Sequence, residues 1–421
     1  MTEHSNIRNV QRKETKFKAL MITVSFPPQI GGIQTALLKL CQRYSRLDVI
    51  VIAPSEKNAA EIDKAQSFPV YRIRPSRTST IGKMIEKVLS TLLGGMLGNM
   101  FRFIVPTWLQ LQRTTISIIQ CGHIRTGLVG YLAKKLYKIP YVIHVHGKEV
   151  PNMANALHVF DRKLGYLAMQ KADFIIAHNE YARLRAIDWG LSESKIKNVR
   201  YGVDFDIFSL VDSKDVESLR SQLTLRGRNI ILTVGRLVEK KAQDAVIRAL
   251  PQVINKVPSV MYLLIGDGPT KSKLESLIKA LKLENHVYFL GVVPHQDIQK
   301  YYALCDVFAM PSRQVGEAVD LDVESFGIVF LEANACSKPV IGGCSGGMNE
   351  SVVSGETGML VDADNTDELA SIIIKLLTDQ ELAKSLGKKG CERVKSKFDW
   401  TIIASEVENI LDDLVRKDIC V

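Results

Sequence analysis

Residues 230–241 read IILTVGRLVEKK, an apolar run that turns directly into a glycine and a group of cations. The run Ile230–Val234 is short and rich in β-branched residues, which is typical of a buried strand in a parallel sheet. Arg236 and Lys241 follow Gly235 where this strand ends. Open α/β sheets bind ligands at the carboxyl ends of their strands, so Gly235–Lys241 is predicted to hold an anion such as a diphosphate.

Similar apolar runs alternate with amphipathic helical patterns through most of the chain, which indicates βαβ units and parallel sheets. The other predicted strands are Ala19–Val24, Val49–Ala53, Ile116–Gln120, Tyr141–Val145, Phe174–Ala177, Met261–Ile265, Val287–Leu290, Val307–Met310 and Val340–Ile341. Each half therefore supplies strands for a doubly wound sheet, and the fold class is α/β with two Rossmann-like domains. The polar stretch Asp204–Arg228 separates the halves, so the predicted domains are residues 1–204 and 205–399.

Composition limits the class of protein. The 421 residues are 46% hydrophobic and 24% charged, which excludes disorder as the dominant state. Seven cysteines without a C-x-x-C pair indicate reduced thiols and a cytoplasmic location. A net charge of +10 suits an anionic membrane surface or phosphorylated small molecules, whereas zinc-finger spacing and RNP-type aromatics are missing and no nucleic-acid partner is expected.

Two segments, one apolar and one basic, are candidates for contact with a membrane surface. The N-terminus lacks the apolar region of a signal peptide, and the most hydrophobic run, Val88–Phe101, is too short to cross a bilayer. Apolar positions in Thr78–Gln112 recur at helical spacing, which favours a core-facing helix. The alternative is that this helix, with Phe101, Phe103 and Trp108, touches a membrane surface. The basic arm Arg8–Lys18 is expected to be solvated, with anionic membrane contact as its alternative.

Two further segments have the composition of a sugar-nucleotide site. Gly31 and Gly32 follow the first strand, where adjacent glycines let the backbone and the next helix approach an anion, although the segment is not G-x-G-x-x-G. Glu324 and Glu332 form an E-x7-E spacing that is predicted to be a loop followed by a helix start. Carboxylates placed there can accept hydrogen bonds from the hydroxyls of a sugar or ribose.

No metal site is predicted. Asp320-Leu321-Asp322 imitates a D-x-D manganese motif, but Arg236 and Lys241 already neutralise a diphosphate. No His/Cys cluster has metal-ligand spacing. His144 is expected to be structural, because it points away from His146 if the strand continues.

The motifs together resemble those of the GT-B glycosyltransferases of the retaining family 4, over nearly the whole chain. They are Pro28–Gly32, His144–Glu149, Gly235–Lys241, Ile265–Pro269, Leu290-Gly291, Pro311–Arg313, Glu324–Ala333 and Gly342–Glu350. Leu321–Glu324 leading into Phe326–Val329 is similar to phosphatidylinositol mannosyltransferases and related cell-envelope enzymes. Two departures lie near the expected donor pocket: Met348-Asn349 replaces a common proline, and Gln314–Asp320 is a longer, more acidic insertion.

The resemblance implies two Rossmann-like domains facing each other across a cleft, the first binding acceptor and the second the nucleotide sugar. The helix over 400–421 would pack back on the first domain. Arg236 and Lys241 would hold the donor diphosphate, Glu324 the sugar hydroxyls, Glu332 the ribose, and His146 would contact the sugar near the reacting carbon. The remaining donor-binding candidates are Gly31, Gly32, Gly235, Phe326, Gly327, Ile328 and Val329, and the acceptor candidates are His123 and Lys148.

The implied activity is transfer of a hexosyl group from a nucleotide diphosphate sugar to a hydroxyl, with retained configuration and without metal or other cofactor. GDP-mannose is the first expected donor, with UDP-glucose or UDP-N-acetylglucosamine second. The acceptor is a sugar, a lipid or a small molecule, at the inner membrane face for a glycolipid. The alternatives are a soluble secondary-metabolite acceptor, a nucleotide-sugar epimerase on the same fold and a non-catalytic binding module.

Overall fold

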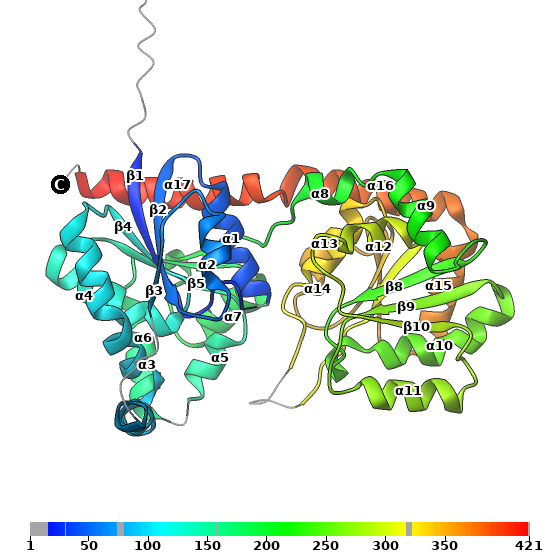
Figure 1. The fold of residues 1–421 in the computed structure, drawn as a ribbon, viewed down its shortest axis with the longest axis horizontal. Coiled ribbons are helices and arrows are strands. Elements are labelled where there is room, and N and C mark those ends of the chain that lie inside the picture. The colour runs from blue at the N-terminus through cyan, green and yellow to red at the C-terminus, as the bar shows by residue number, and fades with distance from the viewer. Residues whose placement is uncertain (1–15, 30, 74–79, 157, 317–321, 420–421) are drawn as a thin grey trace, which may run out of the picture.

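A computed structural model describes residues 16–29, 31–73, 80–156, 158–316 and 322–419, with the side chains of 80–95 and 417–419 left out. Most of the basic arm Arg8–Lys18 and part of the insertion Gln314–Asp320 therefore lie outside the described residues. The chain forms two parallel-sheet Rossmann-like units side by side, each with helices on both faces of its sheet (Figure 1).

The first sheet has seven parallel strands in the order β3-β2-β1-β4-β5-β6-β7 within the described ranges. They are β1 (Phe17–Ile22), β2 (Leu47–Pro54), β3 (Val70–Ile73), β4 (Ile118–Cys121), β5 (Tyr141–Val145), β6 (Phe174–Ala177) and β7 (Ile196–Asn198). The strand order reverses between β1 and β4. The crevice at the carboxyl ends of those two strands is thus the place where such a sheet receives a ligand.

The second sheet has six strands in the order β10-β9-β8-β11-β12-β13 among the residues described. They are β8 (Asn229–Val234), β9 (Val260–Ile265), β10 (Val287–Gly291), β11 (Val307–Met310), β12 (Val340–Gly343) and β13 (Gly358–Val361). Its order reverses between β8 and β11. The loops after these two strands carry Arg236 and Glu324, so both lie at the reversal point.

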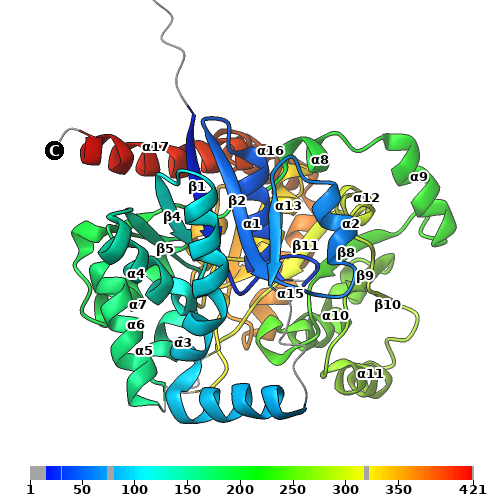
Figure 2. The same ribbon diagram turned by 60° about the vertical axis from the view of Figure 1, so that its left-hand side comes forward.

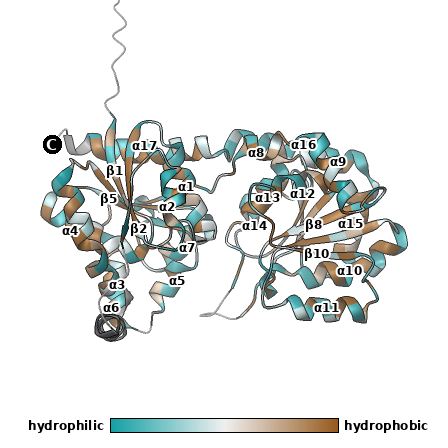
Figure 3. Ribbon diagram, in the orientation of Figure 1, coloured by the Kyte–Doolittle hydropathy of each residue, from teal (hydrophilic) through white to brown (hydrophobic). Residues whose placement is uncertain are grey.

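Helices cover both sheets, and the strands supply the apolar interior while the outer helix faces are polar (Figure 3). Those of the first unit are α1 (Gly32–Arg43), α2 (Ala59–Lys64), α3 (Thr80–Arg113), η1 (Ile124–Thr126), α4 (Gly127–Tyr137), α5 (Glu149–Ala154), α6 (Val159–Lys171), α7 (Glu180–Asp188) and η2 (Glu193–Lys195). Those that follow are α8 (Phe205–Ser209), α9 (Ser213–Gln222), η3 (Glu239–Lys241), α10 (Gln243–Lys256), α11 (Lys271–Ala280), α12 (Ile298–Leu304), α13 (Ile328–Ala335), α14 (Met348–Ser351), α15 (Thr366–Thr378), α16 (Gln380–Lys397) and α17 (Trp400–Ile419).

The C-terminal helix ties the two units together. α17 leaves the second unit and runs along the first, where it lies against α1 (Figures 1 and 2). The buried Glu408 carboxylate accepts hydrogen bonds from the backbone N–H groups of Ser45 at 2.7 Å and Arg46 at 2.6 Å. Where α17 begins, Val203 N–H donates to Phe398 O and Trp400 N–H donates to Val203 O. These bonds join the units at the start of α17.

The predicted strands are present, and three strands were missed. Five of the nine other predicted strands end within one residue of their observed counterparts at both ends, and the rest shift by up to two residues. β3, β7 and β13 had no counterpart in the prediction, and the polar stretch Asp204–Arg228 contains α8 and α9. No described helix has both the length and the apolar character needed to span a membrane.

Candidate functional site

Backbone-to-backbone packing fixes the loop that follows β8. Gly266, with a φ of 132°, lies so close that a Cβ atom would sit 2.0 Å from Gly235 O, so only glycine fits. Leu237 N–H donates to Asp267 O at 3.0 Å, and the Leu237 side chain is fully buried. Arg236 between them is exposed, and within the described chain no hydrogen bond or ion pair engages its guanidinium. The loop thus points the Arg236 guanidinium toward solvent, at the position where the strand order reverses between β8 and β11.

Lys241 and Glu324 form the central pair of the site. Lys241 ends the short helix η3, and its Nζ lies 2.5 Å from Glu324 Oε2, with side chains only 14% and 13% exposed. The Glu324 backbone is held from behind, because Gly347 N–H donates to Glu324 O at 2.9 Å and a Cβ at Gly346 would lie 2.2 Å from that oxygen. A cation suited to phosphate and a carboxylate suited to hydroxyls therefore lie in direct contact.

Glu324 lies before the turn and Glu332 inside α13, as predicted from the E-x7-E spacing. Tyr302 O–H donates to Glu332 Oε2 at 2.6 Å. Burial raises the pKa of Glu332 to about 7, and the Tyr302 bond only partly offsets that rise. Glu332 thus titrates near neutral pH and can offer an acceptor carboxylate to a hydroxyl above that pH.

The turn between the two glutamates brings backbone groups to the site. Phe326 is fully buried and anchors the turn, Gly327 caps α13 with a φ of 80°, and Ile328 and Val329 open the helix. The first N–H groups of a helix have no intrahelical partner, so they can donate to a ligand oxygen. These four donor-binding candidates therefore lie together, beside Glu324.

His146 lies across from this turn, in the first unit. Its Nε2 is 3.1 Å from Gly122 O, which can only accept, so Nε2 carries the proton and Nδ1 accepts from Tyr201 O–H at 2.9 Å. Burial lowers the pKa of His146, so the ring is neutral. The ring is 3% exposed and both of its nitrogens are occupied. Contact between His146 and a donor sugar stays a prediction.

Tyr201 is a residue that the sequence analysis missed. Its ring stacks on His178 and meets Phe326 edge-on, with centroids 5.5 Å apart, while its hydroxyl holds His146. Tyr201 thus touches residues of both units. His144 is fully buried with its ring nitrogens on His178 and Gln120, as expected of a structural residue. The expectation that it points away from His146 is wrong: residues two apart in a strand share a face, and both rings stack on His178.

A hollow of about 310 Å³ lies on the first unit near α1. His123 and Lys148, the predicted acceptor residues, line it together with Ile33, Arg125 and Glu149. His123 Nδ1 accepts from Arg125 N–H, which leaves Nε2–H as the donor, and burial lowers the pKa of His123 to about 4. α1 begins at Gly32, with Gly31 as its N-cap, and the next residue, Ile33, lines the hollow, so the two glycines lie beside it.

Ion pairs join the two units across the site. Asp322 Oδ1 lies 2.5 Å from Lys148 Nζ of the first unit and 2.9 Å from Lys240 Nζ of the second. Burial raises the pKa of Asp322, and hydrogen bonds from both lysines outweigh it, so the net pKa is lowered. Gly147 also faces Ser325, where a Cβ atom would lie 3.3 Å away. Lys148 is therefore shared between the predicted acceptor side and the donor loop.

A second bridge involves Glu350 of α14, the short helix that begins with Met348-Asn349, where the sequence departs from the resembled pattern. Its carboxylate accepts from Glu180 N–H, at the start of α7, at 2.5 Å and from Arg200 Nε at 3.3 Å. Glu350 thus caps a helix of the opposite unit. These bonds fix the position of α14 against the first unit.

Asp322 is the described part of the D-x-D look-alike, while Asp320 and Leu321 lie outside the described residues. The Asp322 carboxylate forms ion pairs with Lys148 and Lys240, and two neighbouring cations disfavour a bound metal ion there. Across the described ranges, no group of three or more His, Cys, Asp or Glu side chains could hold a metal ion.

Family comparisons agree with this geometry. Residues 30–207 match the model described as Glycosyltransferase Family 4, and residues 215–393 match the model described as Glycosyl transferases group 1. A GDP-mannose-dependent alpha-(1-6)-phosphatidylinositol monomannoside mannosyltransferase of Mycolicibacterium smegmatis is 30% identical over 93% of this chain and 97% of its own. The protein of the same description from Mycobacterium tuberculosis is also 30% identical, over 95% and 100%.

Solved structures agree on the fold. HepE of Anabaena, in complex with UDP, superposes with a TM-score of 0.74 at 23% identity, over 94% of this chain and 100% of that one. Sucrose-phosphate synthase of Thermosynechococcus elongatus superposes with a TM-score of 0.74 at 22% identity, over 96% and 100%.

Proposed function

The chain belongs to glycosyltransferase family 4, and from this premise we propose that it transfers a mannosyl group from GDP-mannose to a hydroxyl of a glycolipid. The contact between Lys241 and Glu324 carries the proposal. In a nucleotide diphosphate sugar, the hydroxyls of the sugar lie close to the phosphate that leaves. A cation and a carboxylate in contact, with Arg236 nearby, suit that ligand better than either charge alone.

Donor choice rests on the relatives. Those that are 30% identical over nearly the whole chain are described as GDP-mannose-dependent. HepE, which was solved with UDP, is only 23% identical, so it supports the fold and not the choice of donor. UDP-glucose and UDP-N-acetylglucosamine are the second choice. Glu332, in α13, is the proposed ribose contact, because its carboxylate can accept from two neighbouring hydroxyls.

We propose that transfer retains the anomeric configuration by attack from the face that the leaving group occupies. Negative charge grows on the departing diphosphate, and Arg236, Lys241 and the N–H groups that open α13 stabilise it more in the transition state than in the ground state. The diphosphate itself takes the acceptor proton. A protein nucleophile is therefore not needed, and neither is a metal ion, since the cations do its electrostatic work.

The hollow lined by His123, Arg125 and Lys148 is the proposed acceptor site. It is lined by residues of the first unit, and Lys148 reaches the donor loop through Asp322. A protonated Nε2 on neutral His123 would donate to an acceptor oxygen. The lipid substrates in the names of the relatives support a lipid acceptor, and with it a place at a membrane surface.

A donor screen tests this proposal. The purified protein is incubated with each common nucleotide sugar, with and without a phosphatidylinositol mannoside, and both released nucleotide and labelled lipid are measured. The proposal predicts mannosyl lipid from GDP-mannose and only slow hydrolysis without acceptor. An isomerised nucleotide sugar formed without acceptor would identify an epimerase, and a lack of turnover with every donor would identify a binding module.

A further inference from the structure

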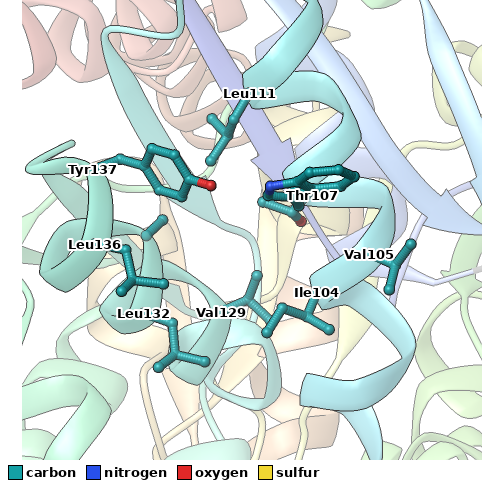
Figure 4. A pocket seen from close by; sticks show the side chains of 10 residues that line it. Ile104, Val105, Thr107, Leu111, Val129, Leu132, Leu136 and Tyr137 are labelled. Carbon is teal, nitrogen blue, oxygen red and sulfur yellow. The ribbon is translucent and has the colours of Figure 1, made fainter.

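The outer flank of the first unit carries an apolar groove that the proposed chemistry does not use. It lies between the second half of α3 and the helix α4, on the side of that unit away from the second one (Figure 1). Its volume is about 280 Å³. Ile104 and Leu111 of α3 lie opposite Leu132 and Leu136 of α4 (Figure 4), and Val105 also lines the groove.

Large apolar side chains around the groove are exposed to solvent. Val105 is 58% exposed and Leu136 is 68% exposed, and Phe101, Trp108 and Tyr137 are also exposed. Isolated apolar residues are common on a surface, but a cluster that surrounds an apolar hollow marks an interaction site. Trp108 and Tyr137 also have polar ends, and such side chains favour the boundary between hydrocarbon and water.

The charged side chains of the two chain segments that form this flank have one sign. The segments 96–113 and 124–140 contain no Asp or Glu. Arg113, Lys135 and Lys138 are exposed there, whereas Lys134 is paired with Asp173. The surface is therefore apolar at its centre and cationic around it. An anionic lipid complements both features, since its chain is apolar and its headgroup is negative.

We propose that the α3–α4 groove binds an acyl chain of an anionic phospholipid and so docks the protein on a membrane leaflet. This extends the proposed glycolipid function. α4 has 11 residues, about 16 Å, and begins next to η1, which carries Arg125 at the acceptor hollow. The groove runs along that helix from Val129 to Tyr137, so a docked membrane would present headgroups within one helix length of the acceptor site.

Flotation with lipid vesicles tests the proposal on the full-length protein. Vesicles of equal parts phosphatidylglycerol and phosphatidylcholine are compared with vesicles of phosphatidylcholine alone. Leu136→Glu places a charge in the groove, and Leu210→Glu is the matched control, because Leu210 is 78% exposed in the second unit. Lys135→Glu with Lys138→Glu tests the headgroup contribution. Donor hydrolysis without acceptor is measured for every variant.

We expect binding to the anionic vesicles, and at least about tenfold weaker partitioning for Leu136→Glu, since one buried leucine is worth that factor. Leu210→Glu should bind like the unmodified chain, and all variants should keep their donor hydrolysis. Lipids brominated on their chains should quench Trp108 fluorescence, a signal that Trp108→Phe removes.

Equal binding by Leu136→Glu and Leu210→Glu, or no binding to anionic vesicles, would overturn the groove proposal. A dimer in solution that Leu136→Glu dissociates would assign the groove to a second copy instead. Vesicle binding without turnover of any nucleotide sugar would leave the groove standing and reject the proposed function, so the two failures are distinguishable.

Discussion

Replacement of Lys241 by methionine separates the stabilising role of the central ion pair from its proposed catalytic role. Lys241 Nζ and Glu324 Oε2 are 2.5 Å apart, and both side chains are mostly buried. Lys241→Met leaves the Glu324 carboxylate without its partner. A fully buried pair loses 3–5 kcal/mol in that way, and for this partly exposed pair we expect a loss of about 1–3 kcal/mol in the free energy of unfolding.

The double variant Lys241→Met/Glu324→Gln carries neither charge, so most of the lost stability should return. Activity should not return. If Lys241 stabilises the departing diphosphate, its loss costs about 2.7–4 kcal/mol of transition-state stabilisation, which is about 100- to 1,000-fold in kcat. Glu324→Gln alone should lower kcat far more than nucleotide affinity.

Urea unfolding gives the stability of each variant, and release of labelled nucleotide with acceptor gives kcat and KM. Lys240→Met is the control, because the adjacent Lys240 pairs with Asp322 rather than Glu324. It should keep kcat within about tenfold, since a partly exposed pair contributes about 0–1 kcal/mol. Near-normal kcat/KM for Lys241→Met, or activity that recovers with stability in the double variant, would refute the reasoning.

Three further changes probe the surroundings of the pair. Tyr201→Phe leaves His146 Nδ1 without its donor, so unfolding free energy should fall by about 1–3 kcal/mol and kcat should fall more than donor affinity; unchanged values in urea unfolding and steady-state kinetics would contradict this. The pKa of Glu332 is raised to about 7, so its carboxylate ionises as pH rises through that value and the donor KM should fall; a Glu332→Gln variant with the same pH profile would argue against ribose binding. Glu408→Ala leaves two backbone N–H groups unpaired and should lower the melting temperature, with about 2–4 kcal/mol less stability by calorimetry; an unchanged melting temperature would exclude a stabilising role for α17 docking.

Buried central strands were predictable because both of their faces are covered and their sequences are continuous apolar runs. The three missed strands are different. β3, β7 and β13 each lie at an edge of a sheet and contain polar residues or glycine, as in Ile196–Asn198. Edge strands bury less of their surface, so the apolar signal that identifies a central strand is weak in them.

The loops of the candidate site were predictable, and their mutual contacts were not. The E-x7-E spacing predicted a loop and then a helix, which the structure has with Gly327 as the cap of α13. Tyr201 gave no motif signal, and Asp322 belonged to the D-x-D look-alike and to the segment Leu321–Glu324 without any predicted partner. Each acts through residues of the opposite unit, and such contacts depend on how the two sheets are placed, which no local pattern encodes.

A crystal structure with bound GDP tests the donor site most directly. We expect oxygens of the β-phosphate about 3 Å from Arg236 and Lys241, and the ribose hydroxyls at the Glu332 carboxylate. A diphosphate found away from both cations, with the loop 235–241 left untouched, would contradict the assignment of this site to a nucleotide sugar.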